Sequence, residues 1–291
     1  MAKLNEEETL EALIEGKTAA IDWLTITCNN VDLERLLWDE ANRLMAIGKA
    51  EGNTQKVWNF RGYTGWSCAS IRIGNRTDGS ILMLSGQAAQ MNWPVALAWA
   101  TNVTRIDIAV TVTMGQPVPN IAQKAYEFIV GPKGCNCKAQ RQYSFIVNSE
   151  GGQTLYVGSR ASDQYGRLYD KGKEDKSLPD LPEGKIWRYE VEFKQYRAKK
   201  IASQLLACAK QNECEPSEDI GATVHKWFLS RGVRPIMATD NGRPFLTEIS
   251  ARITDDLVSL QWLSTQVSPT VRRLMKNGKG DQVFAALGLD K

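Results

Sequence analysis

The strictest pattern in the chain is the alternation along residues 102–113, NVTRIDIAVTVT. From Ile106 to Val112 every second residue is β-branched, whereas Arg105 and Asp107 occupy the alternate positions. Side chains alternate between the two faces of a strand, so this segment predicts a strand with one apolar face and one polar face. A chain that contains such a strand needs a sheet covered on one side.

The same periodicities assign the other elements. Strands are expected at 20–28, within 56–88, within 151–171 and at 185–194. Helical spacing or helix-forming composition predicts helices at 5–16, 32–50, 93–100, 119–130, 197–210, 217–231, 255–265, 269–276 and 280–288. We therefore expect an α+β fold, with a mostly antiparallel central sheet, helices packed on one side, and a helical C-terminal part. The expected division is a sheet-based core over 1–200 and a mainly helical part over 201–291, which the sequence also allows to be continuous with the core.

Composition restricts the class of protein. Hydrophobic residues make up 43% and charged residues 24% of the 291, an ordinary globular balance. No window approaches eighteen uninterrupted apolar residues, and the N-terminal segment lacks the pattern of a signal peptide. We expect a cytoplasmic protein without a membrane partner.

Functional groups gather on the polar faces of three expected strands. The segment GRLYDKG (166–172) places Arg167, Tyr169 and Lys171 at alternate positions. The segment WRYEVEFK (187–194) places Glu190 and Glu192 on one face, and the 102–113 strand adds Asp107. If these strands are neighbours, the carboxylates, the cations and the phenol converge.

Such a cluster suits phosphoryl transfer. Carboxylates bind hard divalent ions such as Mg²⁺ or Mn²⁺, which stabilise charge on a phosphate. A tyrosine hydroxyl becomes a nucleophile when nearby cations favour its anion, and Arg and Lys also bind the phosphodiester. The alternative hypothesis is an exposed sheet face stabilised by cross-strand ion pairs, with no catalytic role.

Six segments, taken in order, resemble the rolling-circle replication initiators of the Rep_trans type. They are IDWLTIT, ILMLSGQA, RIDIAV, TLYVGSRASDQYGRLYDKGKE, WRYEVEFK and LQWLSTQVSPTVRRLM, and together they span roughly residues 20–288. The resemblance implies a site-specific DNA endonuclease and strand transferase. A tyrosine of such an enzyme attacks a phosphodiester at the origin and leaves a 5′-phosphotyrosyl link and a free 3′-OH, with a divalent metal, Mg²⁺ or Mn²⁺, as cofactor.

The resemblance assigns the site residue by residue. Tyr169 matches the tyrosine of the family's R-x-Y-D-K motif, so Tyr169, Arg167 and Lys171 are the expected catalytic residues, and Tyr165 is the rival nucleophile in the turn segment ASDQYG. The expected metal ligands are Asp107, Glu190 and Glu192. Many relatives carry a second Asp four residues after the first, and here that position is Thr111.

The expected partners follow from this function. They are origin DNA, as a single strand or a hairpin, a host helicase and a second copy of the chain in a homodimer. The relaxase of a mobile element has the same chemistry and remains an alternative. A non-catalytic DNA-binding regulator of replication or transcription is the alternative from another class.

Local basic clusters predict where DNA binds by charge, since the net charge of +3 is too small to decide. The expected DNA-binding residues are Arg160, Lys194, Arg197, Lys199, Lys200, Arg272, Arg273 and Lys276. Three aromatic residues, Trp58, Tyr63 and Trp66, have either of two roles, stacking on unpaired bases or packing in the core.

Overall fold

The architecture is a single antiparallel sheet with ten strands among the described residues. The computed structural model describes residues 10, 12–130, 143–174, 181–211, 216–237, 242–245 and 268–286. The strand order is β2-β3-β4-β5-β1-β6-β10-β9-β8-β7. The strands are β1 (Ile14–Cys28), β2 (Lys56–Phe60), β3 (Tyr63–Cys68), β4 (Ile71–Arg76), β5 (Gly79–Ser85), β6 (Asn102–Met114), β7 (Tyr143–Val147), β8 (Gln153–Val157), β9 (Gln164–Asp170) and β10 (Ile186–Lys194).

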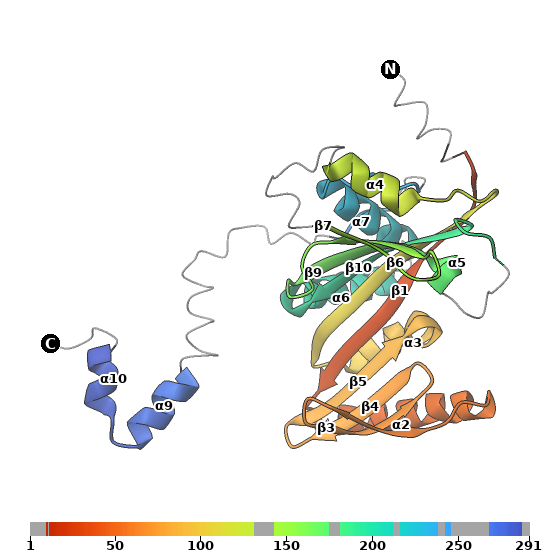
Figure 1. The fold of residues 1–291 in the computed structure, drawn as a ribbon. Helices are drawn as coiled ribbons and strands as arrows, with labels where there is room; N and C mark the ends of the chain where they lie inside the picture. The colour runs from red at the N-terminus through yellow and green to blue at the C-terminus, as the bar shows by residue number, and fades with distance from the viewer. Residues whose placement is uncertain are drawn as a thin grey trace. The chain divides into compact units, whose positions relative to one another are not determined.

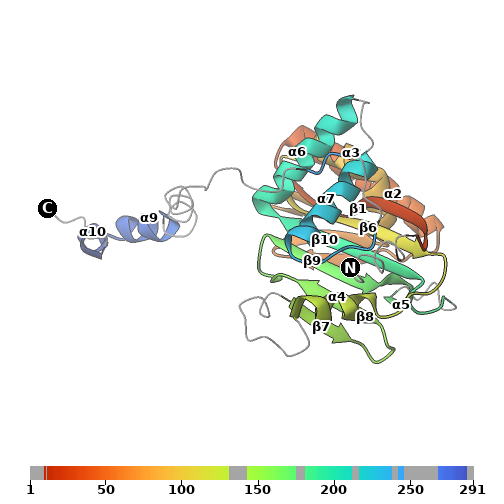
Figure 2. The same cartoon turned by 90° about the horizontal axis from the view of Figure 1, so that it is seen from above.

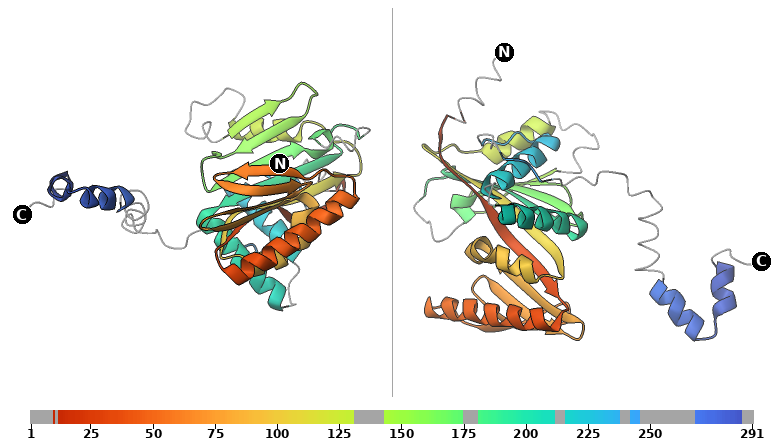
Figure 3. Two further views of the ribbon diagram at one scale, coloured as in Figure 1. Left: turned by 90° about the horizontal axis from the view of Figure 1, so that it is seen from below. Right: turned by 180° about the vertical axis from the view of Figure 1, so that it is seen from behind.

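The two longest strands, β1 and β6, run side by side through the centre of the sheet (Figure 1). The helices are α2 (Val31–Ala50), α3 (Gly86–Trp99), α4 (Ile121–Val130), α5 (Lys171–Glu174), α6 (Gln195–Gln211), α7 (Pro216–Ser230), α9 (Ser268–Lys276) and α10 (Gly280–Ala286). Figure 2 shows α6 and α7 lying across the central strands, and Figure 3 shows α2 beside β3 and β4. The α+β prediction, with helices on one side of an antiparallel sheet, is confirmed.

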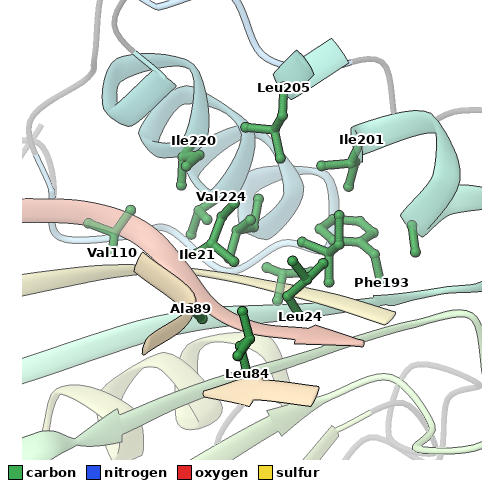
Figure 4. Packing of buried hydrophobic residues seen from close by; sticks show 14 of the residues in the cluster. Ile21, Leu24, Leu84, Ala89, Val110, Phe193, Ile201, Leu205, Ile220 and Val224 are labelled. Carbon is green, nitrogen blue, oxygen red and sulfur yellow. The ribbon is translucent and has the colours of Figure 1, made fainter. Parts of the chain in front are cut away.

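The main hydrophobic core lies between the sheet and these helices. Ile201 and Leu205 of α6 and Val224 of α7 point toward Leu24 and Val110 of the strands (Figure 4). The β-branched residues of β6 predicted to share one face are all buried in this core. Burial of this apolar face fixes the register of β6, because a slip of one residue would turn its polar face inward.

Two elements differ from their predictions. A helix was expected over 5–16, but β1 already begins at Ile14, and its first residues pair with the end of β6. The expected helix at 93–100 begins earlier, at Gly86, and contains Pro94. In both cases long-range packing decides the structure: pairing with β6 extends β1, and contact with β1 holds α3. The helix expected at 255–265 lies outside the described residues.

The chain divides into two compact units, Met1–Thr247 and Glu248–Lys291. The sheet, α6 and α7 belong to the first unit, and α9 and α10 to the second. A functional division after residue 200 stays a prediction. None of the described helices is both long and apolar enough to cross a membrane.

Candidate active site

The face of the sheet opposite the main core carries polar side chains at its centre. The register of β10 with its two neighbours pairs Glu192 with Asp107 on one side and Glu190 with Arg167 on the other. Residues that pair directly across antiparallel strands project from the same face. The expectation that these three strands are neighbours is therefore confirmed, and their polar faces form one surface.

Glu190 is the centre of this surface. Its side chain is 2% exposed. Tyr169 donates its hydroxyl hydrogen to Glu190 Oε2 at 3.2 Å, and Arg167 forms an ion pair with Glu190 Oε1. A buried carboxylate needs such partners, because leaving it unpaired costs several kcal/mol. One side chain thus holds both the phenol and the guanidinium.

The surroundings of Tyr169 do not favour its anion. Burial raises the pKa of the Tyr169 phenol above its usual value, the charge of Glu190 adds to the rise, and Arg188 and Arg167 oppose it. The expectation that flanking cations lower this pKa is therefore wrong for this arrangement. The reason is that Arg167 is neutralised by Glu190 and the phenol is 5% exposed.

A second network surrounds Asp107. Arg105 donates from Nε to Asp107 Oδ1 at 2.8 Å and pairs through Nη2 with Glu192 Oε2 at 2.7 Å. Lys194 pairs with the other oxygen of Glu192 at 2.6 Å. Burial raises the pKa of Asp107 to about 7, and Glu190 and Glu192 add to the rise, whereas Arg105 favours the carboxylate. The two networks bring three carboxylates and three cations to one surface.

The three expected metal ligands are bound by arginines in this arrangement. Asp107 and Glu192 share the guanidinium of Arg105, and Glu190 binds Arg167. Within the described part of the chain, no group of three or more His, Cys, Asp or Glu side chains is placed to hold a metal ion. The carboxylates suit Mg²⁺ or Mn²⁺ by their chemistry, and the ligand assignment stays a prediction.

Arg188, which the sequence analysis did not assign to the site, joins it from β10. It pairs with Asp22 of β1 at 2.9 Å and donates from Nε to Thr111 Oγ1 at 2.9 Å. The register places Arg188 opposite Tyr169. Thr111, where relatives carry a second acid, is therefore a hydrogen-bond acceptor for an arginine. The sequence offered one indication that Arg188 belongs to the site, namely that it shares a strand face with Glu190. Its partner Asp22 could not be predicted, because it lies 166 residues away in β1.

Tyr165 lies inside β9 rather than in a turn. It is 8% exposed, its ring stacks on Tyr156 with centroids 5.8 Å apart, and Arg160 lies over it at 5.8 Å. Burial raises the pKa of its phenol. The turn prediction was wrong because β9 begins at Gln164, where pairing with Phe193 starts. Tyr165 and Tyr169 consequently share one face of one strand.

Lys171 lies beyond the end of β9. It is the first residue of α5 and pairs with Glu174 at 2.7 Å. The alternation of cations around Tyr169 therefore ends at Asp170, whose carboxylate accepts hydrogen bonds from the backbone N–H groups of Gly184 and Lys173. These bonds turn the chain out of the sheet, which is why Lys171 leaves the face.

A pocket of about 100 Å³ opens beside Tyr169. Its lining residues are Asn148, Gly152, Gln153, Thr154, Tyr156, Arg167, Tyr169, Asp170 and Glu174. The pocket is small, and Arg167 and Tyr169 contribute to its wall.

The expected DNA-binding cations fall into two groups. In the first unit, Lys194 donates to the carbonyls of Arg160 and Ser162, and Arg197 pairs with Asp163 at 2.8 Å. Lys199 is exposed and Lys200 half-buried on α6. In the second unit, the exposed residues Arg272, Arg273 and Lys276 lie on α9.

Comparison with known proteins supports the resemblance over part of the chain. Residues 101–230, which contain β6, β7 to β10, α6 and α7, match the family model described as replication initiation factor (Rep_trans). A comparison with curated protein sequences gives no significant match. A rolling circle replication initiator protein from Geobacillus stearothermophilus is similar in structure, with 18% identity and a TM-score of 0.48 over 84% of this chain and 97% of that chain. A likeness at this level does not establish function.

Proposed function

We propose that this chain, whose residues 101–230 match the replication initiation factor family, is a rolling-circle replication initiator that nicks and rejoins origin DNA through a tyrosine. The observation that carries the proposal is the contact between Tyr169 and Glu190 on the polar face of the sheet. A nucleophile hydrogen-bonded to a base, with an arginine beside both, is the arrangement that phosphodiester transfer requires.

Glu190 is the general base in this proposal. Because burial raises the pKa of Tyr169, free phenolate is scarce near neutral pH, and the proton must pass to a group in contact. The distance of 3.2 Å from the hydroxyl to Glu190 Oε2 is within the range for such a transfer. Glu190 therefore takes the phenol proton as the oxygen of Tyr169 attacks.

The covalent step is a transfer of one phosphate. A bond forms between the Tyr169 oxygen and phosphorus, while the bond from phosphorus to the 3′ oxygen breaks. The departing oxygen takes a proton from water and becomes the 3′-OH, and the 5′ end stays on the tyrosine. Arg167 and Arg188 stabilise the charge on the phosphoryl oxygens.

A divalent ion, Mg²⁺ or Mn²⁺, is part of the proposal through the family resemblance alone. Asp107, Glu190 and Glu192 are the carboxylates whose chemistry would suit it, but Arg105 and Arg167 bind them in this structure, and no step is assigned to the ion. A host helicase and a homodimer likewise remain proposals. A relaxase of a mobile element would use the same residues.

The test is a denaturing-gel assay for a covalent protein–DNA adduct. The full chain is incubated, with Mg²⁺ or Mn²⁺ and with EDTA, on single-stranded oligonucleotides tiled across its own coding and flanking DNA. We expect an adduct in the wild type and in Tyr165→Phe, and none in Tyr169→Phe.

Each other result has a defined meaning. Loss of the adduct only in Tyr165→Phe would keep the enzyme and move the nucleophile. Absence of any adduct, together with binding that weakens with salt, would contradict the enzyme and support the non-catalytic regulator.

A further inference from the structure

A second group of side chains lies on the same face of the sheet as the Tyr169 cluster, but on strands outside the matched segment. Tyr63, Ile81 and Met83 form a small apolar cluster there, against which Trp23, Trp58 and Phe60 pack half-buried. All six come from strands, and none comes from a described helix. We call the four aromatic residues Trp23, Trp58, Phe60 and Tyr63 the aromatic shelf.

Arginines lie over the rings of the shelf. Arg61 lies 5.2 Å from the ring centroid of Phe60, and Arg76 lies 4.4 Å from that of Tyr63. Over residues 56–85 the sequence has four cations and a single acid, Asp78, which pairs with Arg76. The net charge of this segment is positive, so the shelf suits a polyanion rather than a basic or a neutral protein surface.

The glycines of β3 and β4 leave the backbone bare under the shelf. A Cβ at position 74 would lie 3.2 Å from Trp58 Cζ3, so the indole of Trp58 rests on the backbone at Gly74. Gly65 is the partner of both Trp58 and Gly74 in the register. Trp58 is also stacked on Phe60, with centroids 5.7 Å apart and planes at 13°. Two nearly parallel rings held against the sheet form a stacking platform.

Trp23 connects the shelf to the candidate active site. In the register it is opposite Asp107. Its ring lies between two guanidinium groups, that of Arg72 at 5.5 Å and that of Arg105 at 4.8 Å. Arg72 Nη1 is buried and has no hydrogen-bond partner among the described residues. A row of aromatic rings and arginines thus leads from β2 to the residues around Glu190.

We propose that single-stranded DNA lies along this row, with unpaired bases stacked on Trp58 and Phe60 and phosphates bound by Arg61 and Arg72. The proposal rests on the proposed function, which supplies the DNA, and adds a binding surface remote from the nick. Base–aromatic stacking tolerates any sequence, and its combination with arginines is typical of single-strand binding. A duplex cannot offer its base faces to the rings.

The sheet sets the length of the contact. Seven strand steps separate β2 from β9. At about 4.8 Å a step the row is about 34 Å long, which accommodates up to about ten nucleotides at a spacing of about 3.4 Å. Affinity for an oligonucleotide is therefore expected to rise with the length of its overhang on one side of the nick and to stop rising near ten nucleotides.

Trp66 provides the matched control. It was one of three aromatic residues for which stacking was considered, but its register partner Ile73 is buried in the main core, so Trp66 belongs to the other face of the sheet. It is 42% exposed. Substitution of Trp66 removes an exposed indole from the same strand pair without touching the shelf.

The experiment measures binding of the full chain to fluorescent oligothymidine of 20 nucleotides, and to a duplex of equal length, by anisotropy. Both Trp58→Leu and Phe60→Leu are expected to weaken single-strand binding about tenfold each, and Trp66→Leu less than twofold. Duplex binding is expected to change less than twofold. Thermal melting of each variant checks the fold. If a tryptophan variant unfolds, Arg61→Gln serves as the test instead, because Arg61 lies at an exposed turn. This variant is expected to reduce the slope of log affinity against log salt for single strands by about 0.7.

Three results would overturn the inference. The first is an equal loss of single-strand affinity in Trp58→Leu and Trp66→Leu, and the second is an equal loss of affinity for duplex and single strand. The third is unchanged DNA binding in Trp58→Leu together with a change from dimer to monomer. The last would make the shelf an interface between two copies of the chain. The assay is independent of nicking. If the wild type forms an adduct at Tyr169 and the shelf variants bind single strands as the wild type does, the shelf alone is rejected. If the shelf variants lose single-strand binding and the wild type forms no adduct, the nicking function alone is rejected.

Discussion

The Tyr169 hydroxyl donates a hydrogen bond to Glu190 Oε2 at 3.2 Å, and both side chains are at least 95% buried. The contact joins neighbouring strands that are 21 residues apart in sequence. It gives the phenol a proton acceptor in a place where water is largely excluded. This is the relationship on which the catalytic proposal can be tested most directly.

Glu190→Gln is expected to slow adduct formation about 10² to 10⁴-fold, because an amide cannot accept the phenol proton. The measurement is the single-turnover rate of adduct formation at saturating oligonucleotide. Glu15→Gln is the control, since Glu15 pairs with Lys185 and lies outside the candidate site. An equal loss of rate in both variants would contradict the role of Glu190 as the base.

The buried ion pair of Arg167 and Glu190 makes a prediction about stability. Arg167→Met leaves the Glu190 carboxylate buried without its cation, which is expected to lower the free energy of unfolding by about 3 kcal/mol. Arg43→Met breaks the exposed pair with Glu40 and is expected to cost far less, because water screens that pair. Urea denaturation measures both. A similar loss of unfolding free energy in both variants would show that the Arg167–Glu190 pair is as well solvated as the Arg43–Glu40 pair.

The raised pKa of Asp107 predicts how stability depends on pH. In the unfolded chain this carboxyl has a pKa near 3.8, and in the folded protein about 7. Between these values the folded state binds more protons than the unfolded state, so this group makes the protein less stable as the pH rises from about 4 to about 7. Asp107→Asn is expected to flatten that decline. Urea denaturation in EDTA across this range measures it, and an unchanged slope in the variant would contradict the assignment.

Part of the polar face could be predicted from local sequence patterns. Alternation along 102–113 and 187–194 correctly predicted two central strands and placed Asp107, Glu190 and Glu192 on one face. The strand containing Tyr169 also followed, because GRLYDKG reads as a strand, whereas its place beside β10 is known only from the structure. These features depend on side-chain period and burial, which a single segment encodes.

The partners of these groups depend on distant segments. Nothing in the spacing of 187–194 indicates that Arg105 would bind both Asp107 and Glu192, or that Asp22 would bind Arg188. The departure of Lys171 from the strand follows from hydrogen bonds between Asp170 and the backbone of Gly184. Cross-strand register and buried charge pairing are long-range properties, and for that reason the composition of the face did not predict which cations bind its carboxylates.

The basic residues of α9 make a prediction about salt. If Arg272, Arg273 and Lys276 each bind a phosphate, changing all three to Ala lowers the slope of log affinity against log salt by about 2 for single-stranded DNA. The combined variant Lys199→Ala, Lys200→Ala tests the α6 cations in the same way, with an expected reduction of about 1.4. Anisotropy titrations at several salt concentrations measure both. A slope that does not change would mean that the substituted residues are ordinary solvated surface.

Gly166 links the helices behind the sheet to the residues on its polar face. It lies between Tyr165 and Arg167 in β9, and a Cβ at this position would lie 2.3 Å from Trp227 Cζ3 of α7. Trp227 cannot easily give way, because it is buried and donates from Nε1 to Gln164 Oε1 at 2.6 Å. Gly166→Ala is therefore expected to lower the free energy of unfolding by about 1 to 3 kcal/mol through overpacking.

The same substitution is expected to slow adduct formation, since β9 must shift to relieve the clash and carries the candidate nucleophile with it. Gly16→Ala is the control, because its Cβ would meet only Thr113 Cβ at 3.9 Å. Combining Gly166→Ala with Trp227→Phe should restore part of the stability and part of the rate, as the smaller ring removes the contact. Urea denaturation and single-turnover assays of the single and double variants measure this coupling. Strict additivity of the two substitutions would show that the ring of Trp227 does not position β9.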